Sequence, residues 1–180
     1  KAAARTDGLS GLESGFHALD KMTSGWQNSD LVIIAARPAM GKTAFVLSMA
    51  KNMAVNAKIP VALFSLEMSN VQLVNRMIVN VCEIPGEKIK SGQLAPYEWG
   101  QLDYKIKELY DAPMYVDDTP SLSVFELRTK ARRLVREHGV KIIIIDYLQL
   151  MNASGMSFGS RQEEVSTISV SYTHLTLPTI

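Results

Sequence analysis

Short apolar runs alternate along the chain with longer segments in which apolar residues recur every three or four positions. The runs at residues 31–35, 61–65 and 142–145 are almost continuously apolar, as is typical of strands buried on both faces of a sheet. A shorter run covers residues 114–116. Strands that alternate with helices in this way predict an α/β fold, with a mainly parallel sheet covered by helices on both faces.

The segments between these runs have helical periodicity and helix-capping residues. Ser69 and Gln72 form one expected capping box, and Ser123 and Glu126 form a second. Gly139 suits the C-terminal end of the helix that follows Ser123. The expected order is strand 31–35, helix from Thr43, strand 61–65, helix after Ser69, loop 83–96, helix 97–110, strand 114–116, helix after Ser123 and strand 142–145.

The two ends of the chain differ in character from its middle. Residues 1–10 read as the end of a linker, and the folded domain is expected over residues 11–169. Residues 152–161 are small and polar and are expected to form a loop after the last strand, with a further helix beginning in 161–168. In residues 170–180 threonines, β-branched residues and a proline replace the helical periodicity. An edge strand would look similar, but we interpret this stretch as a non-native tail.

Composition sets limits on the class of protein. The formal net charge is +1, so the chain as a whole carries no field that would favour nucleic acid or a membrane surface. No apolar run approaches the roughly 20 residues that span a bilayer, and residues 1–10 lack the apolar core of a signal peptide. The single Cys82 excludes an internal disulfide, and the histidines have no metal-ligand spacing. We therefore expect a cytoplasmic protein without a membrane span.

The stretch A-R-P-A-M-G-K-T, residues 36–43, has the pattern of a phosphate-binding loop between a strand and a helix. Gly41 allows the backbone to approach a phosphate, Lys42 can neutralise the β- and γ-phosphates, and Thr43 can offer its hydroxyl to Mg²⁺. Ala36 stands where this pattern normally has glycine. Alanine is tolerated there if its φ is negative, because only a positive φ is costly for a residue with a Cβ.

Two carboxylates are candidates for the rest of a nucleotide site. Asp146 ends the most apolar strand of the chain, as expected of an aspartate in a magnesium shell. Many motor ATPases have a glutamate at the next position, where this chain has Tyr147. Glu67, just after strand 61–65, is the candidate that would orient a water molecule. A surface acid near a helix N-terminus explains Glu67 equally well, and the residues alone leave the two readings balanced.

Four segments together resemble the DnaB family of bacterial replicative DNA helicases. They are S-G-W-Q-N-S-D-L at 24–31, A-R-P-A-M-G-K-T at 36–43, F-S-L-E-M-S at 64–69 and I-I-I-D-Y-L-Q-L-M at 143–151. The resemblance implies a RecA-like ATPase domain that assembles as a homo-hexamer. It also implies ATP and Mg²⁺ as cofactors, and movement 5′ to 3′ on single-stranded DNA with unwinding at the replication fork.

The resemblance also implies roles for individual residues. Glu67 would activate water, with Lys42 as a second catalytic residue, and Thr43 and Asp146 would hold the metal ion. Gln149 would take part in coupling, and Ser154, Gly155 and Arg161 would contact DNA from the loop 152–161. The implied nucleotide-binding residues are Ala39, Met40, Gly41, Lys42, Thr43, Ala44 and Arg76.

The chain departs from the family pattern at both ends. The resemblance implies an N-terminal helical domain that contacts primase, which we expect to be missing from these residues, and a continuation after Ser169 with further DNA loops and an arginine finger, which we expect the tail to replace. We therefore expect a domain truncated on its C-terminal side that does not itself unwind DNA. Primase and a helicase loader are the further partners expected of the full-length family.

Three other functions fit a phosphate loop. RecA-like recombinases, repair ATPases and clock ATPases share the fold, but the F-S-L-E-M-S and D-Y-L-Q-L-M segments argue against them. A small-molecule kinase would need an arginine-bearing lid, and Arg132, Arg133 and Arg136 are better explained as the solvated face of a helix. A nucleotide-binding scaffold without turnover would have no need of Glu67.

Overall fold

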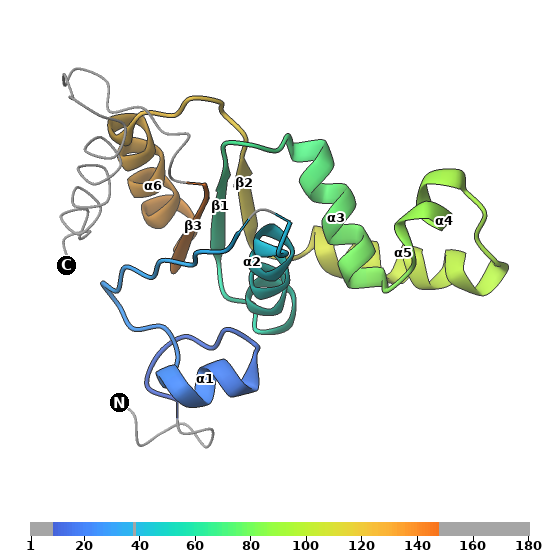
Figure 1. Ribbon diagram of the computed structural model, residues 1–180, viewed down its shortest axis with the longest axis horizontal. Coiled ribbons are helices and arrows are strands. Elements are labelled where there is room, and N and C mark those ends of the chain that lie inside the picture. The colour runs from blue at the N-terminus through green and yellow to red at the C-terminus, as the bar shows by residue number, and fades with distance from the viewer. Residues whose placement is uncertain (1–8, 38, 148–180) are drawn as a thin grey trace.

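The fold is built on a parallel sheet with its most apolar strands side by side. The computed structural model describes residues 9–37 and 39–147, and within these residues three strands form the order β2-β1-β3. The strands are β1 Val61–Ser65, β2 Met114–Asp117 and β3 Ile142–Asp146 (Figure 1). In register, Phe64 lies opposite Asp117 and Ser65 lies opposite Asp146, so two acidic residues reach the same carboxyl edge of the sheet.

Helices cover both faces of this sheet. In Figure 1, α6 lies on one side of the strands and α2 on the other, and α3, α4 and α5 extend away from the sheet beside α2. This confirms the predicted α/β architecture. The helices are α1 His17–Thr23, α2 Lys42–Lys51 with the π-helical turn η2 Asn52–Asn56, α3 Asn70–Cys82, α4 Gly86–Ser91, α5 Pro96–Tyr110 and α6 Val124–His138.

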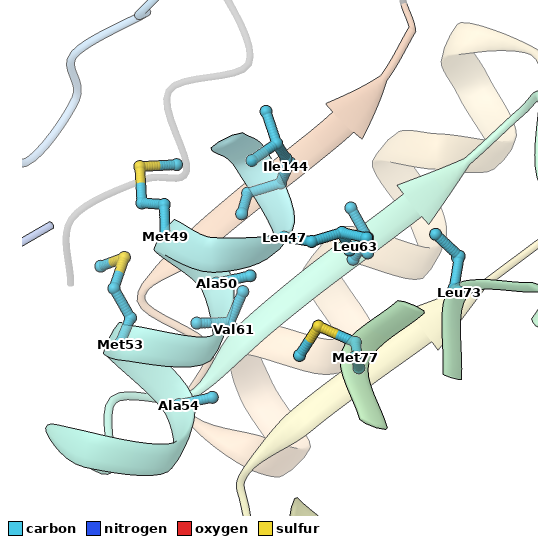
Figure 2. Packing of buried hydrophobic residues seen from close by; sticks show 11 residues of the cluster. Leu47, Met49, Ala50, Met53, Ala54, Val61, Leu63, Leu73, Met77 and Ile144 are labelled. Carbon is cyan, nitrogen blue, oxygen red and sulfur yellow. The ribbon is translucent and has the colours of Figure 1, made fainter. Parts of the chain in front are cut away.

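The central strand β1 is buried along its whole length and contributes side chains to the hydrophobic core on each face of the sheet. Because successive side chains of a strand point to opposite faces, Val61 and Leu63 pack with the apolar residues of α2 and α3 (Figure 2). Ala62 and Phe64 pack on the other face, where α6 contributes Leu127. A continuous apolar run is therefore required here, as the sequence pattern predicts for a strand covered on both faces.

The prediction of a buried strand at residues 31–35 is wrong. The segment is an extended connection from α1 to α2 without strand pairing to any described residue (Figure 1). Ile34 packs against the core, but Leu31, Val32 and Ile33 are 44%, 45% and 69% exposed. An apolar run specifies that a segment can enter a sheet, but backbone pairing with a neighbouring strand is what makes it a strand.

The sequence pattern does not predict two short helices that the structure contains. α4 occupies part of the expected loop 83–96, with Pro85 as its N-cap residue and Gly92, in the left-handed conformation, as its C-cap residue. Proline and glycine thus bound this helix instead of excluding it. α1 lies in the expected irregular lead-in and has only 7 residues, just under two turns, which is too short for a clear helical pattern.

The lead-in before the phosphate loop is folded onto α2. The Asp20 carboxylate is buried and accepts hydrogen bonds from the backbone N–H groups of Ser14, at 2.7 Å, and Gly15, at 3.2 Å. Phe16 stacks on Phe45 of α2 with ring centroids 4.8 Å apart. A Cβ on Gly15 would lie 2.3 Å from the Cβ of Asn52, so this close approach requires glycine. These contacts fix the segment that leads to the site.

Both predicted capping pairs lie at helix starts, Ser69 with Gln72 at α3 and Ser123 with Glu126 at α6, and the complete box at α6 gives a stability prediction. The Ser123 Oγ accepts from the backbone N–H of Glu126, and the Glu126 carboxylate accepts from the Ser123 N–H at 3.0 Å. Ser123→Ala removes the first bond, so we expect a free energy of unfolding lower by about 1 kcal/mol in urea titrations. Ser123→Thr keeps the hydroxyl and should lose much less. Equal losses in both variants would contradict a capping role.

None of the helices in the described part of the chain combines the length and the hydropathy needed to cross a membrane. Several sequence predictions fall outside the described residues. They are the residues Gln149, Ser154, Gly155 and Arg161, the loop 152–161, the helix in 161–168 and the tail 170–180.

Candidate nucleotide-binding site

The candidate site lies where the carboxyl ends of β1 and β3 meet the first turn of α2. Parallel strands bring their carboxyl ends to one edge, and ligands of open α/β sheets bind outside that edge. Here Ser65 of β1 is paired in register with Asp146 of β3, and α2 begins at Lys42. The motif residues and the sheet edge predicted from the sequence therefore meet in space.

Two described residues of the phosphate loop have a left-handed backbone conformation. Ala39 and Gly41 have φ values of 64° and 84°, and the Met40 N–H donates to the Arg37 carbonyl at 3.2 Å. Left-handed residues are common in turns whose backbone N–H groups bind anions. Gly41 has no atom within 4 Å of where a Cβ would stand, which leaves room for a phosphate to approach the backbone. Ala36 does not have a positive φ, which is the condition under which alanine is tolerated at this position.

Lys42, Thr43 and Asp146 form a closed set of contacts. The Lys42 Nζ lies 2.8 Å from one carboxylate oxygen of Asp146, and the Thr43 hydroxyl donates to the other at 2.9 Å. Asp146 is only 5% exposed, and each of its two carboxylate oxygens contacts one of these two residues. Thr43 and Asp146, which are 103 residues apart in sequence, are thus in direct contact.

The same three side chains suit a nucleotide with a divalent cation. A hydroxyl and a carboxylate are hard oxygen donors, and Mg²⁺ typically takes one or two such protein ligands together with substrate phosphates. No group of three or more histidine, cysteine, aspartate or glutamate side chains among the described residues could hold a metal without a substrate. The Lys42 Nζ also lies 4.2 Å from the ring centroid of Tyr147, which gives the ammonium a second favourable contact.

Glu67 is exposed in a tight turn between β1 and α3. The Ser65 hydroxyl closes this turn, accepting from the Met68 N–H at 3.1 Å and donating to the Met68 carbonyl at 2.8 Å. The Leu66 N–H donates to the Asp146 carbonyl at 2.8 Å, which ties the turn to β3. Glu67 therefore lies at the same edge as Asp146, although no contact in the described structure joins its carboxylate to the phosphate loop.

Arg76 is not brought to the phosphate loop. It is exposed on α3, whose buried side is formed by Leu73 and Met77, and no contact in the described structure links it to Lys42 or Thr43. The arginines weighed as a kinase lid are exposed on α6. Two of them lie near Glu137, with Arg133 at 3.9 Å and Arg136 at 3.7 Å. Their position agrees with the prediction of a solvated helix face.

Two acidic residues at the end of β2 contact neighbouring helices and not the described part of the phosphate loop, and the motifs in the sequence do not single them out. Asp117 ends β2, and its carboxylate accepts from the Lys130 Nζ at 2.7 Å and from the Thr119 N–H at 3.0 Å. Burial raises the pKa of Asp117, but the hydrogen bonds from Lys130 and Thr119 outweigh burial and leave the pKa lowered. Asp118 binds Asn70 at the start of α3. Consecutive acids directly after a predicted strand were the available signal for both.

A phosphate loop before a helix, with an aspartate at the end of the neighbouring strand, defines a phosphate-loop nucleotide-binding protein. The sequence profile described as "DnaB-like helicase C terminal domain" matches residues 11–177. This chain belongs to that family, which confirms the resemblance found in the four sequence segments. Membership of this family implies that the chain binds a nucleotide.

Individual relatives agree with this assignment. The chain is 50% identical over 161 residues to "Replicative DNA helicase DnaB" of Geobacillus stearothermophilus, covering 89% of this chain and 36% of that relative. It is 46% identical over 165 residues to "Replicative DNA helicase DnaC" of Bacillus subtilis (strain 168), covering 92% of this chain and 36% of that relative. The chain thus spans about a third of the length of these curated relatives.

Solved structures show the same fold. One that is described as an "ATPase Domain" superposes with a TM-score of 0.88 at 35% identity, covering 97% of this chain and 62% of the other. A second structure, described as "The Structure Of A DnaB-Like Replicative Helicase And Its Interactions With Primase", superposes with a TM-score of 0.87 at 37% identity, covering 93% of this chain and 41% of the other. The predicted RecA-like α/β fold is therefore confirmed.

Proposed function

We propose that this chain is the ATP-hydrolysing core of a replicative DNA helicase. The full-length protein would use ATP and Mg²⁺, work as a homo-hexamer, move 5′ to 3′ on single-stranded DNA and unwind the duplex. The observation that supports this most is the convergence of Lys42, Thr43 and Asp146 at one sheet edge, in a chain of the DnaB-like helicase family.

The residues of the loop would divide the work of binding. The backbone N–H groups in the first turn of α2 would bind a phosphate, and the helix dipole would add to this attraction. The Lys42 ammonium would contact the β- and γ-phosphates, leaving the Asp146 carboxylate to join the Thr43 hydroxyl as a cation ligand. A bound Mg²⁺ would supply charge neutralisation at the phosphates.

Glu67 would act as the general base. Its carboxylate is exposed at the carboxyl edge of the sheet and would take a proton from the attacking water. Arg76 would reach a nucleotide only through a change in its position, and we retain it as a binding residue of the assembled protein. Gln149 in coupling, and Ser154, Gly155 and Arg161 in DNA contact, complete the proposed machinery.

The organisation of the whole protein is also part of this proposal. Residues 1–10 would end a linker, residues 11–169 would form the partial ATPase domain, and residues 170–180 would be a non-native tail. One solved relative is described with its interactions with primase, and we propose primase and a helicase loader as partners of the full-length protein. We place that protein in the cytoplasm.

The proposal predicts DNA-stimulated ATP hydrolysis by a full-length helicase that carries this domain. Lys42→Ala should weaken ATP binding roughly 10- to 150-fold, because a hydrogen bond to a charged group is worth about 1.5–3 kcal/mol. Lys51→Ala, at the opposite end of the same helix, is the matched control and should bind ATP normally. Turnover would be measured with and without single-stranded DNA, and affinity by titration with a fluorescent ATP analogue.

Two results would contradict the proposal. Turnover that does not respond to single-stranded DNA would remove the helicase function. Equal ATP affinity for Lys42→Ala and Lys51→Ala would show that the nucleotide binds elsewhere.

A further inference from the structure

Asp118 makes a two-point contact with the first residue of α3. One carboxylate oxygen accepts from the Asn70 backbone N–H at 2.8 Å, and the other accepts from the Asn70 side-chain amide at 3.0 Å. Asp118 follows β2, and β2 is the neighbour of β1 in the sheet. A side chain 48 residues away in sequence thus holds the end of the connection that carries Glu67.

Hydrogen bonds fix this connection, residues 66–69, on both sides of Glu67. On the β1 side, the Ser65 hydroxyl closes the turn on Met68. On the α3 side, the Ser69 N–H donates to Gln72 at 3.2 Å within the capping box, and Asp118 holds Asn70. The Glu67 side chain itself has no hydrogen bond or ion pair to any described residue. Its position is therefore set by the anchors of its backbone.

We propose that Asp118 is a positioning residue for Glu67. This inference rests on the proposed function, because it takes Glu67 as the residue that activates water. A charge-assisted hydrogen bond to an N–H group at a helix start is strong, and a negative charge is favourable there. Asp118 thereby sets where α3 begins and how the Glu67 carboxylate faces the sheet edge. A general base is sensitive to such placement, since a shift of about 1 Å can cost on the order of 100-fold in rate.

The neighbouring Asp117 is a natural control within the same loop. Its carboxylate contacts Lys130 of α6 and the Thr119 N–H, and makes no contact with the 66–69 connection. Its backbone is continuous with that of Asp118, and its side-chain contacts are of similar length. The two adjacent acids therefore contact different helices: Asp117 contacts α6 and Asp118 contacts α3.

The test compares single and double variants in a full-length helicase that carries this domain. We expect Asp118→Ala to lower the kcat of ATP hydrolysis about 10-fold with little change in KM, since the phosphate loop is untouched. Asp118→Asn, which keeps an acceptor for the Asn70 N–H, should recover part of this loss. Asp117→Ala should leave kcat within about 2-fold of wild type at temperatures where it is folded.

The double variant separates positioning from general damage. If Asp118 acts through Glu67, then Asp118→Ala should cause no further loss of kcat in a Glu67→Gln background. An equal loss in both backgrounds, or an unchanged kcat in Asp118→Ala, would overturn the inference. Wild-type turnover in Glu67→Gln alone would instead overturn the proposed role of Glu67 as the general base, whereas turnover that ignores single-stranded DNA would overturn the proposed helicase function. If Asp118→Ala does not fold, Asn70→Ala removes one of the two contacts and should give the same pattern at smaller size.

Discussion

Replacing Glu67 with glutamine is expected to lower the kcat of ATP hydrolysis by about 10²- to 10⁴-fold, the usual contribution of a positioned general base. Glutamine has nearly the same shape but cannot accept a proton from water. Because Glu67 is exposed and has no side-chain partner among the described residues, the fold should be unaffected. ATP affinity should also be unchanged, since the contacts proposed for the phosphates come from the loop before α2.

The measurement is steady-state hydrolysis with an independent ATP titration for each variant. Glu87→Gln is the matched control, because Glu87 is also a surface acid but lies on α4. Its turnover should equal that of the wild type. A loss of less than about 10-fold in Glu67→Gln, or a loss of ATP binding, would assign the proton transfer to another group and Glu67 to the surface.

Phe64→Ala is expected to cause the largest loss of stability, about 3–5 kcal/mol in the free energy of unfolding. Phe64 has 0% exposure in the central strand and packs against the α6 side of the sheet, where Leu122 and Leu127 are also buried. Truncation to alanine leaves a cavity there that neighbouring strands cannot easily fill. Domains are stable by only about 5–15 kcal/mol, so this one change would remove a large share of the total.

Urea titration followed by circular dichroism would measure this effect. Phe125→Ala is the control, because Phe125 is 63% exposed on α6 and its truncation should change the free energy of unfolding by less than about 0.5 kcal/mol. Similar losses in the two variants would show that the α6 face of the sheet is not a packed core.

Local signals in the sequence predict most of the fold. β1, β3 and α6 are recognisable because their apolar spacing and capping residues describe contacts within a few positions. The prediction for the run 31–35 fails because its apolar residues do not say which strand would pair with them. Leu31 and Ile33 are exposed and their segment is not among the strands of the described sheet, which the run itself does not encode.

In the candidate site too, residues of a local motif can be predicted and contacts between distant segments cannot. Lys42, Thr43 and Asp146 can be predicted because phosphate chemistry restricts the residue types and their place beside strand and helix. The anchoring of Asn70 by Asp118 cannot, because it depends on β2 lying beside β1, a fact of topology between segments distant in sequence. Motifs reveal which groups meet the substrate, and the fold reveals which groups hold them.

The ion pair between Lys42 and Asp146 has a thermodynamic consequence for ligand binding. The cation of the loop and the anion of the neighbouring strand neutralise each other, so a nucleotide that takes the lysine leaves a nearly buried carboxylate without its charge partner. A divalent cation that binds the Asp146 carboxylate without a nucleotide leaves the Lys42 ammonium without its charge partner in the same way. Each ligand alone meets a penalty that the two together avoid. Nucleotide and cation should therefore bind with positive cooperativity, each raising the affinity of the site for the other by the same factor.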